Sequence, residues 1–96
     1  MRYKDLTHGG KVFTKSNHID FILKNLNLYW LIDSEIENAS IEIQRGTIIW
    51  KSGDFYSGNW KYGIFKSGNF HGIWENGIFE GGNFKGIWKS GINELI

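Results

Sequence analysis

Large apolar and polar residues alternate with a fixed period in the second half of the chain. From Trp60 the sequence reads WKYGIFKSGNFHGI, then WENGIFEGGNFKGI, then WKSGI, so one pattern with three aromatic residues recurs every fourteen residues. A short element repeated in this way cannot bury its apolar side chains alone and needs copies above and below it. The pattern therefore predicts stacked copies of one small β element, which form an elongated body with an extended surface.

The same pattern continues toward the N-terminus with different residues. Ile36 and Ile41 lie five residues apart, and each follows a small residue by two positions; from Gly53 onward glycine and an aromatic residue take these two places. We therefore expect the repeats to run over residues 34–92, within a β repeat region of residues 34–96. The segment 44–52 interrupts the pattern and does not reveal its register.

Residues 1–33 have an ordinary composition and predict a cap for the first repeat. Apolar residues recur there at helical spacing, namely at Ile19, Ile22, Leu23 and Leu26. With Ser16 or Asn17 as N-cap, this spacing predicts a helix over about residues 17–26. The continuous apolar run LYWLI predicts a strand at about residues 28–32. Because the end of a repeat stack needs cover, both elements are expected to cap it within one compact domain.

The order of residue types within the repeats resembles the pentapeptide-repeat family. The resemblance covers residues 34–92 and rests on units such as GDFYS at 53–57 and GNWKY at 58–62: a small residue, Asp or Asn, a large apolar residue and two polar ones. It implies a right-handed β-solenoid with four sides. Two units, GNFH at 68–71 and GNFK at 82–85, have only four residues, and a turn built from two longer units and one of these would have three sides.

A second resemblance implies a different β fold. FHGIWENG at 70–77 and FKGIWKSG at 84–91 are similar to the aromatic-x-G-x-W-x-x-G core of MORN repeats, which form antiparallel hairpins in an open curved sheet. Asn76-Gly77 and Gly81-Gly82 are suitable hairpin turns. We therefore predict an all-β repeat protein, a small β-solenoid with an N-terminal helix-plus-strand cap, with a MORN-like antiparallel meander as the alternative.

In a solenoid, residues one period apart lie above one another. The period then predicts a structural ladder of three aromatic columns: Trp60, Trp74 and Trp88; Phe65 and Phe79; and Phe70 and Phe84. Asn69 and Asn83 are expected to form an amide ladder. Charged residues alternate in sign in two further columns, and the candidate surface contacts are Lys61, Lys66, Glu75, Glu80, Lys85 and Lys89.

Composition argues against several classes of chemistry. The chain has no cysteine and a formal net charge of +1, which is typical neither of nucleic-acid-binding proteins nor of acidic mimics of DNA. The three histidines, at positions 8, 18 and 71, have no partner at metal-ligand spacing, and Glu75 and Glu80 are expected to point in different directions on successive sides. We expect no catalytic, cofactor-binding or metal-binding residue. The absence of a leader-like or membrane-length apolar run predicts a cytoplasmic protein with no membrane contact.

These observations predict a non-catalytic binding protein that presents a rigid repeat surface to a protein partner. Short glycine-aromatic repeats also have the style of small phage proteins, so an inhibitor of a host factor, in the host cytoplasm, is one form of this hypothesis. The alternative is a carbohydrate-binding or single-stranded nucleic-acid-binding module with exposed aromatic rings. An open strand edge after Gly91 predicts a homodimer through the C-terminal end of the repeats, at Ile92, Leu95 and Ile96.

Overall fold

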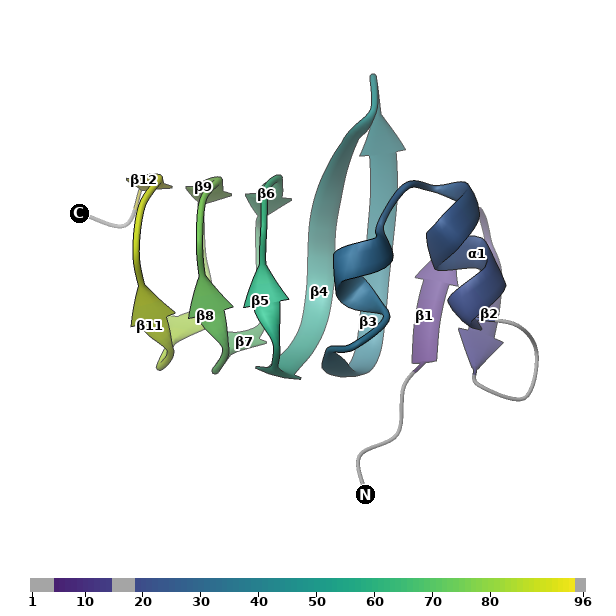
Figure 1. Cartoon of the computed structure of the whole chain (residues 1–96), viewed down its shortest axis with the longest axis horizontal. Helices are drawn as coiled ribbons and strands as arrows, with labels where there is room; N and C mark the ends of the chain where they lie inside the picture. Colours follow the sequence, from purple (N-terminus) through teal and green to yellow (C-terminus); the bar gives the residue numbers. More distant parts are fainter. Residues whose placement is uncertain (1–4, 15–18, 95–96) are drawn as a thin grey trace.

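The computed structural model of the chain describes residues 5–14 and 19–94. The strands follow one another along the long axis of the molecule, with β2 near one end and β12 at the other (Figure 1). The first half contains β1 (Asp5–His8), β2 (Lys11–Thr14), α1 (Ile19–Asn25), the 3-10 helix η2 (Tyr29–Leu31), β3 (Glu35–Gln44) and β4 (Thr47–Ser57). The short strands that follow are β5 (Asn59–Trp60), β6 (Ile64–Phe65), β7 (Asn69–Phe70), β8 (Ile73–Trp74), β9 (Ile78–Phe79), β10 (Asn83–Phe84), β11 (Ile87–Trp88) and β12 (Ile92–Asn93).

The short strands wind into a β-solenoid with three sides. Strands β5, β8 and β11 pair in parallel along one side, β6, β9 and β12 along the second, and β7 and β10 along the third. Equivalent residues of successive coils are direct partners, as in Trp60 with Trp74. The expectation of a small β-solenoid is confirmed. The MORN-like meander is wrong because the repeats pair in parallel, and the four-sided section implied by the pentapeptide resemblance is replaced by a triangular one.

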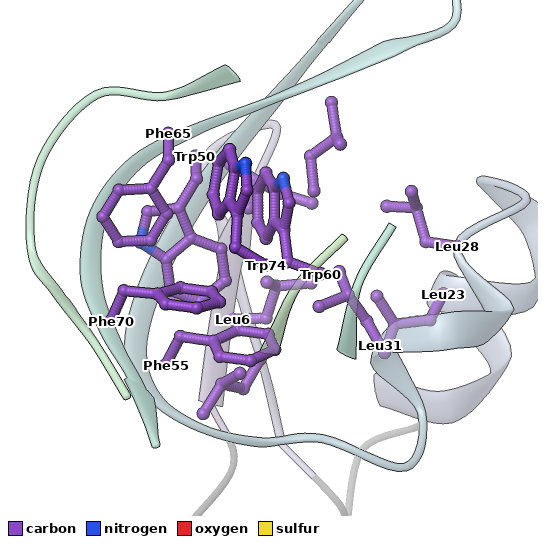
Figure 2. Packing of buried hydrophobic residues seen from close by; sticks show 14 of the residues in the cluster. Leu6, Leu23, Leu28, Leu31, Trp50, Phe55, Trp60, Phe65, Phe70 and Trp74 are labelled. Atoms are coloured by element: carbon purple, nitrogen blue, oxygen red, sulfur yellow. The ribbon is translucent and has the colours of Figure 1, made fainter. Parts of the chain in front are cut away.

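The interior of the solenoid consists of stacked aromatic rings (Figure 2). Phe65 and Phe79 lie parallel with ring centroids 5.2 Å apart, and the rings of Phe70 and Phe84 are 5.3 Å apart. Between columns the rings meet edge to face, as Trp74 does with Phe79 at 5.6 Å. Such pairs each contribute about 0.5–1.5 kcal/mol beyond the burial of their area.

Strand β4 supplies the first two sides of the solenoid. Trp50 pairs with Phe65 and Phe55 pairs with Phe70, so β4 begins two of the aromatic columns. The first step is one residue longer than the later ones: Asp54 and Asn69 are fifteen residues apart, whereas Asn69 and Asn83 are fourteen apart. The difference arises because the third side shortens from the five residues 53–57 to the four residues 68–71.

Glycine permits the close approach of successive coils at the corners. At Gly68 the backbone has φ +115°, and a Cβ there would meet the carbonyl oxygen of Gly53. At Gly86 φ is not positive, but a Cβ would meet the carbonyl oxygen of Gly72. Crowding between coils therefore requires glycine at both positions, and positive φ adds to the requirement only at the first.

Residues 35–44 do not form a solenoid side, contrary to the sequence expectation. They form β3, which pairs antiparallel with β4 through a turn in which Arg45 and Gly46 have positive φ. Ile36 and Ile41 are both buried, although an odd spacing puts residues of a regular strand on opposite faces. Register shifts between them, with positive φ at Asn38, restore the common face. A bulged strand thus shares the five-residue spacing of the repeats.

The segment between the N-terminal hairpin and β3 covers the start of the tryptophan column. Helix α1 matches the predicted helix within its described residues, while Ser16 and Asn17 lie outside them. The predicted strand at 28–32 is wrong: Tyr29–Leu31 form a 3-10 helix that contacts β5. Its Trp30 ring meets Trp60 edge-on, with centroids 5.1 Å apart. Ser34 ends this turn by donating a 2.6 Å hydrogen bond to the Leu31 carbonyl.

The hairpin of β1 and β2 was not predicted. Gly9 and Gly10 form its turn with positive φ, and Leu6 is its one fully buried apolar residue among those described. Leu6 pairs with Ala39 of β3, so β1 continues the sheet that contains β4, β6, β9 and β12. The sheet therefore crosses the expected boundary between residues 33 and 34.

Candidate interaction surface

The inward aromatic residues determine which side chains face outward. Neighbouring residues along a strand point to opposite faces, so the residues before and after each inward ring lie on the outer surface. Each side of the solenoid thus carries two outward columns along its length. We refer to the sides as the β5–β8–β11 wall, the β6–β9–β12 wall and the β7–β10 wall.

Two walls expose columns of isoleucine. On the β5–β8–β11 wall the column consists of Asn59, Ile73 and Ile87, and on the β6–β9–β12 wall it includes Ile64, Ile78 and Ile92. Ile87 is 61% exposed and Ile92 is 58% exposed, while Ile64, Ile73 and Ile78 are half-buried. Ile49, which pairs with Ile64 and begins the second column, is buried. The period of the sequence already aligns these isoleucines. The aromatic residue that follows an isoleucine points inward, which indicates that the isoleucine itself faces outward.

The β7–β10 wall carries polar residues at the equivalent positions. Asn83 Nδ2 donates to Asn69 Oδ1 at 3.2 Å, and Asn69 Nδ2 donates to Asp54 Oδ1 at 2.7 Å. The expected amide ladder is present, and a carboxylate at Asp54 begins it. Its groups bond to one another along the wall, so this wall differs chemically from the two with isoleucine.

Tyr56 and His71 stand beside this ladder. The Tyr56 hydroxyl donates to Asp54 Oδ2 at 3.1 Å, and its ring is 6.1 Å from the imidazole of His71. Desolvation raises the pKa of Tyr56, and hydrogen bonding to the carboxylates of Asp54 and Glu37 raises it further. Each of these causes favours the protonated phenol, so the hydroxyl acts as a donor on this wall.

The charged candidates lie on the outer surface, next to the isoleucine columns or the ladder. Lys61 Nζ lies 2.7 Å from Glu75 Oε2, with 44% and 30% of the two side chains exposed. An exposed pair of this kind contributes about 0.2–1 kcal/mol. Within the described residues no ion pair joins Lys66 to Glu80, although they share a column. Lys66, Lys85 and Lys89 are exposed and Glu80 is half-buried.

The ladder residues of the sequence prediction line the interior. Trp60, Trp74 and Phe79 have no exposed surface, while Phe84 and Trp88 in the last coil are partly exposed. A row of indoles on a wall, which a carbohydrate or single-stranded nucleic acid would need, is not present among the described residues. Of the predicted oligomer end, Ile92 is exposed, and Leu95 and Ile96 lie outside the described residues.

The described part of the chain holds neither a cluster of metal ligands nor a membrane-spanning helix. No three His, Asp or Glu side chains among residues 5–14 and 19–94 gather as ligands of a metal ion would. His8 and His71 belong to no such group. Neither helix in this part is long and apolar enough to cross a bilayer.

Comparison with known proteins identifies no relative of this chain. No protein-family model, no curated protein and no solved structure matches the chain. The arguments for function therefore rest on the walls and the open end of the solenoid.

Proposed function

We propose that the protein is a non-catalytic interaction protein that presents its two isoleucine walls to a protein partner. The observation that carries the proposal is the difference between walls of the same backbone geometry. The outward position before each inward ring holds Asp or Asn on the β7–β10 wall. On the other two walls it holds isoleucine, except at Asn59 in the first coil. Solvent alone favours the polar choice, and exposed apolar columns are typical of contact surfaces.

The rigidity of the coils supports this role. Backbone N–H groups of each coil donate to carbonyls of the coil before it, as Glu75 does to Trp60 and Glu80 to Phe65, both at 2.8 Å. Stacked rings fix the interior beneath the same strands. A surface that is ordered before binding loses little conformational entropy on association, which favours affinity.

The chemistry of the two walls fits a protein better than a nucleic acid. The isoleucine columns lie beside columns that mix lysine and glutamate, such as Lys61 with Glu75, and the chain has a net charge of +1. A nucleic-acid partner calls for clustered positive charge. An apolar ridge flanked by both signs of charge matches the composition of protein interfaces. A phage-type inhibitor of a host factor in the cytoplasm is a finer form of this proposal and stays a prediction.

The alternative modules are less well supported. Carbohydrate or single-stranded nucleic-acid binding through aromatic rings depends on exposed rings, and Trp60 and Trp74 are fully buried. Membership of the pentapeptide-repeat family rests on residue order alone. We therefore keep protein binding through the isoleucine walls as the proposed function.

The test has two steps: affinity capture from cells with the parent protein identifies the partner, and the affinities of two double variants for that partner are then measured. Ile73→Asn with Ile78→Asn removes one isoleucine from each wall in a middle coil and introduces a residue that Asn69 and Asn83 show to be compatible with this position. The matched control, His71→Ser with Lys85→Ser, changes two outward residues of the β7–β10 wall. We expect the isoleucine variant to bind the partner roughly tenfold more weakly or worse and the control to bind as the parent does. Unchanged binding by a folded isoleucine variant contradicts the proposal.

A further inference from the structure

The β6–β9–β12 wall carries a column of charges whose sign changes once along its length. The column consists of the outward residues that follow the inward position of each strand, and it begins on β4, whose Trp50 pairs with Phe65 of β6. From β4 to the last coil its members are Lys51, Lys66, Glu80 and Glu94. Two positive charges are thus followed by two negative charges, one on each strand, beside the isoleucine column of the same wall.

These charges are available to another molecule. In the part of the chain that the structure describes, no ion pair involves any of the four side chains. Glu80 is half-buried and the other three are exposed. The β5–β8–β11 wall differs in this respect, because Lys61 Nζ lies 2.7 Å from Glu75 Oε2 within the same chain. One isoleucine wall therefore pairs charge internally, and the other presents unpaired charge of both signs.

A column of charges that changes sign at its midpoint is complementary to itself when its order is reversed. A twofold axis in the plane of this wall, parallel to its strands and between β6 and β9, reverses the order of the strands. It sets Lys66 against the second copy's Glu80, and the outer lysine against the outer glutamate, with each pair formed twice. The same axis keeps the two isoleucine columns in contact, with Ile64 against the second copy's Ile78. An axis along the solenoid would instead set isoleucine against charge.

The other two walls do not match a second copy in this way. The charged column of the β5–β8–β11 wall consists of Lys61, Glu75 and Lys89, so its reversal sets Glu75 against Glu75 and lysine against lysine. Like charges that face each other across an interface oppose association. The β7–β10 wall has Asn69 and Asn83 in place of isoleucine. Among the walls formed by the described coils, the β6–β9–β12 wall alone combines an apolar column with a self-complementary charged one.

We propose that two copies of this chain associate face to face through the β6–β9–β12 wall, about the twofold axis between β6 and β9. The proposal rests on the proposed function in one respect, since it takes the outward isoleucines to be a contact surface, and it assigns one of the two isoleucine walls to a second copy. The β5–β8–β11 wall of each copy lies outside this contact and stays open to a different protein. Because each copy uses the same wall, the contact closes with two copies and gives a dimer rather than a filament.

Sedimentation equilibrium of the purified chain and of two charge-reversal variants tests this dimer. Lys66→Glu and Glu80→Lys each set like charges together at the two central places of the dimer, so each variant alone is expected to dimerise roughly tenfold more weakly or worse. An equimolar mixture of the two variants restores opposite charges at both places and is expected to form a mixed dimer about as readily as the parent dimerises. The mixture also controls for folding, because a variant that has lost its fold does not recover association on mixing.

Lys85→Glu is the matched control, because it makes the same change of charge at an exposed lysine of the β7–β10 wall, and it is expected to leave the dimer unchanged. Four strands form a small contact, so the measurement extends to about 1 mM protein. A parent that is monomeric throughout this range overturns the proposal. A species larger than a dimer, a mixture that associates no better than either variant alone, or equal weakening by Lys85→Glu also overturns it.

These measurements use the purified chain alone, without another protein. The proposed function fails by a different observation, namely unchanged binding of the captured partner by folded Ile73→Asn with Ile78→Asn. Failure of the dimer is therefore distinguishable from failure of the proposed function.

Discussion

The indole rings of Trp60 and Trp74 lie parallel, with centroids 5.1 Å apart and an angle of 8° between their planes. They are fourteen residues apart in the sequence and direct partners in neighbouring strands. Trp74 repeats this relationship with Trp88, at 5.4 Å and 9°. The period of the sequence thus appears in space as one coil, and the stability of the coil depends on rings placed above rings.

The middle tryptophan of this column is expected to be the most costly to remove. Trp74 is fully buried and stacks on a ring at each face, so Trp74→Ala should reduce the free energy of unfolding by about 3–5 kcal/mol. Trp88→Ala should cost clearly less, because Trp88 stacks on one neighbour and is partly exposed. Urea denaturation of both proteins measures the difference. Equal losses at the two positions would contradict the stacked column.

Removal of one whole coil tests the period itself. Deletion of residues 74–87 joins His71-Gly72-Ile73 to Trp88 and leaves every column in register, so the shortened chain is expected to fold with a lower melting temperature. Deletion of residues 61–73, one residue fewer, places Trp74 directly after Trp60 and moves the rings of Phe79, Phe84 and Trp88 by one position, from inward to outward. It is expected to prevent folding of the coils that follow. Far-UV circular dichroism and thermal unfolding compare the two. A folded product from both deletions is the outcome that this account cannot accommodate.

The repeated half of the fold could be predicted because its period places identical side chains in contact. The aromatic columns and the Asn69–Asn83 ladder follow from spacing alone, and even the three-sided section follows from the shorter unit at 68–71. The isoleucine walls could also be deduced, since each isoleucine precedes an inward ring. Which wall meets a partner depends on the partner, and the chain carries no pattern for that.

The first half of the fold could not be predicted to the same extent, because its apolar runs are short and are compatible with both helix and strand. In LYWLI, Leu28 and Leu31 are buried and Tyr29 is 58% exposed, a three-residue spacing that one helical turn satisfies. Short apolar runs of this kind do not separate helix from strand. Strand β2 contains Val12, which is 56% exposed, so the N-terminal hairpin lacks apolar alternation and only Gly9-Gly10 marks it.

Crowding at a coil corner gives a prediction with a control elsewhere in the chain. Gly86→Ala would push a methyl group against the Gly72 carbonyl and is expected to cost about 1–3 kcal/mol of unfolding free energy. Gly9→Asn places a residue that tolerates positive φ where nothing lies within 4 Å, and should change stability by less than about 0.5 kcal/mol. Chemical denaturation of both variants provides the comparison. If Gly86→Ala is as stable as the parent protein, the two coils do not lie as close together at Gly86 and Gly72 as described here.

The raised pKa of Tyr56 predicts a pH dependence at the alkaline end. Because the pKa is higher in the folded state than the ordinary 10.0, the protonated phenol stabilises the fold. That contribution is fully present below the pKa of an unfolded tyrosine and is lost as pH rises through the folded value. Subtracting the tyrosinate absorbance of Tyr56→Phe from that of the parent isolates the ionisation of Tyr56. This ionisation should occur at higher pH than that of free tyrosine. Asp54→Asn removes the negative charge that accepts the hydrogen bond of the Tyr56 hydroxyl, so it should lower the pKa of Tyr56 toward that of free tyrosine. If the pKa of Tyr56 equals or lies below that of free tyrosine, the contact with Asp54 is refuted.

Proton NMR contacts between indole rings test the parallel coil most directly. In a solenoid with one coil per fourteen residues, the ring protons of Trp74 give nuclear Overhauser effects to both Trp60 and Trp88, and Trp60 gives none to Trp88. Isotope labelling of tryptophan, with Trp74→Phe as the assignment control, resolves the three rings. We expect the two contacts through Trp74 and the absence of the third. Cross-strand contacts typical of antiparallel hairpins, without either indole contact, would contradict the solenoid and the surfaces derived from it.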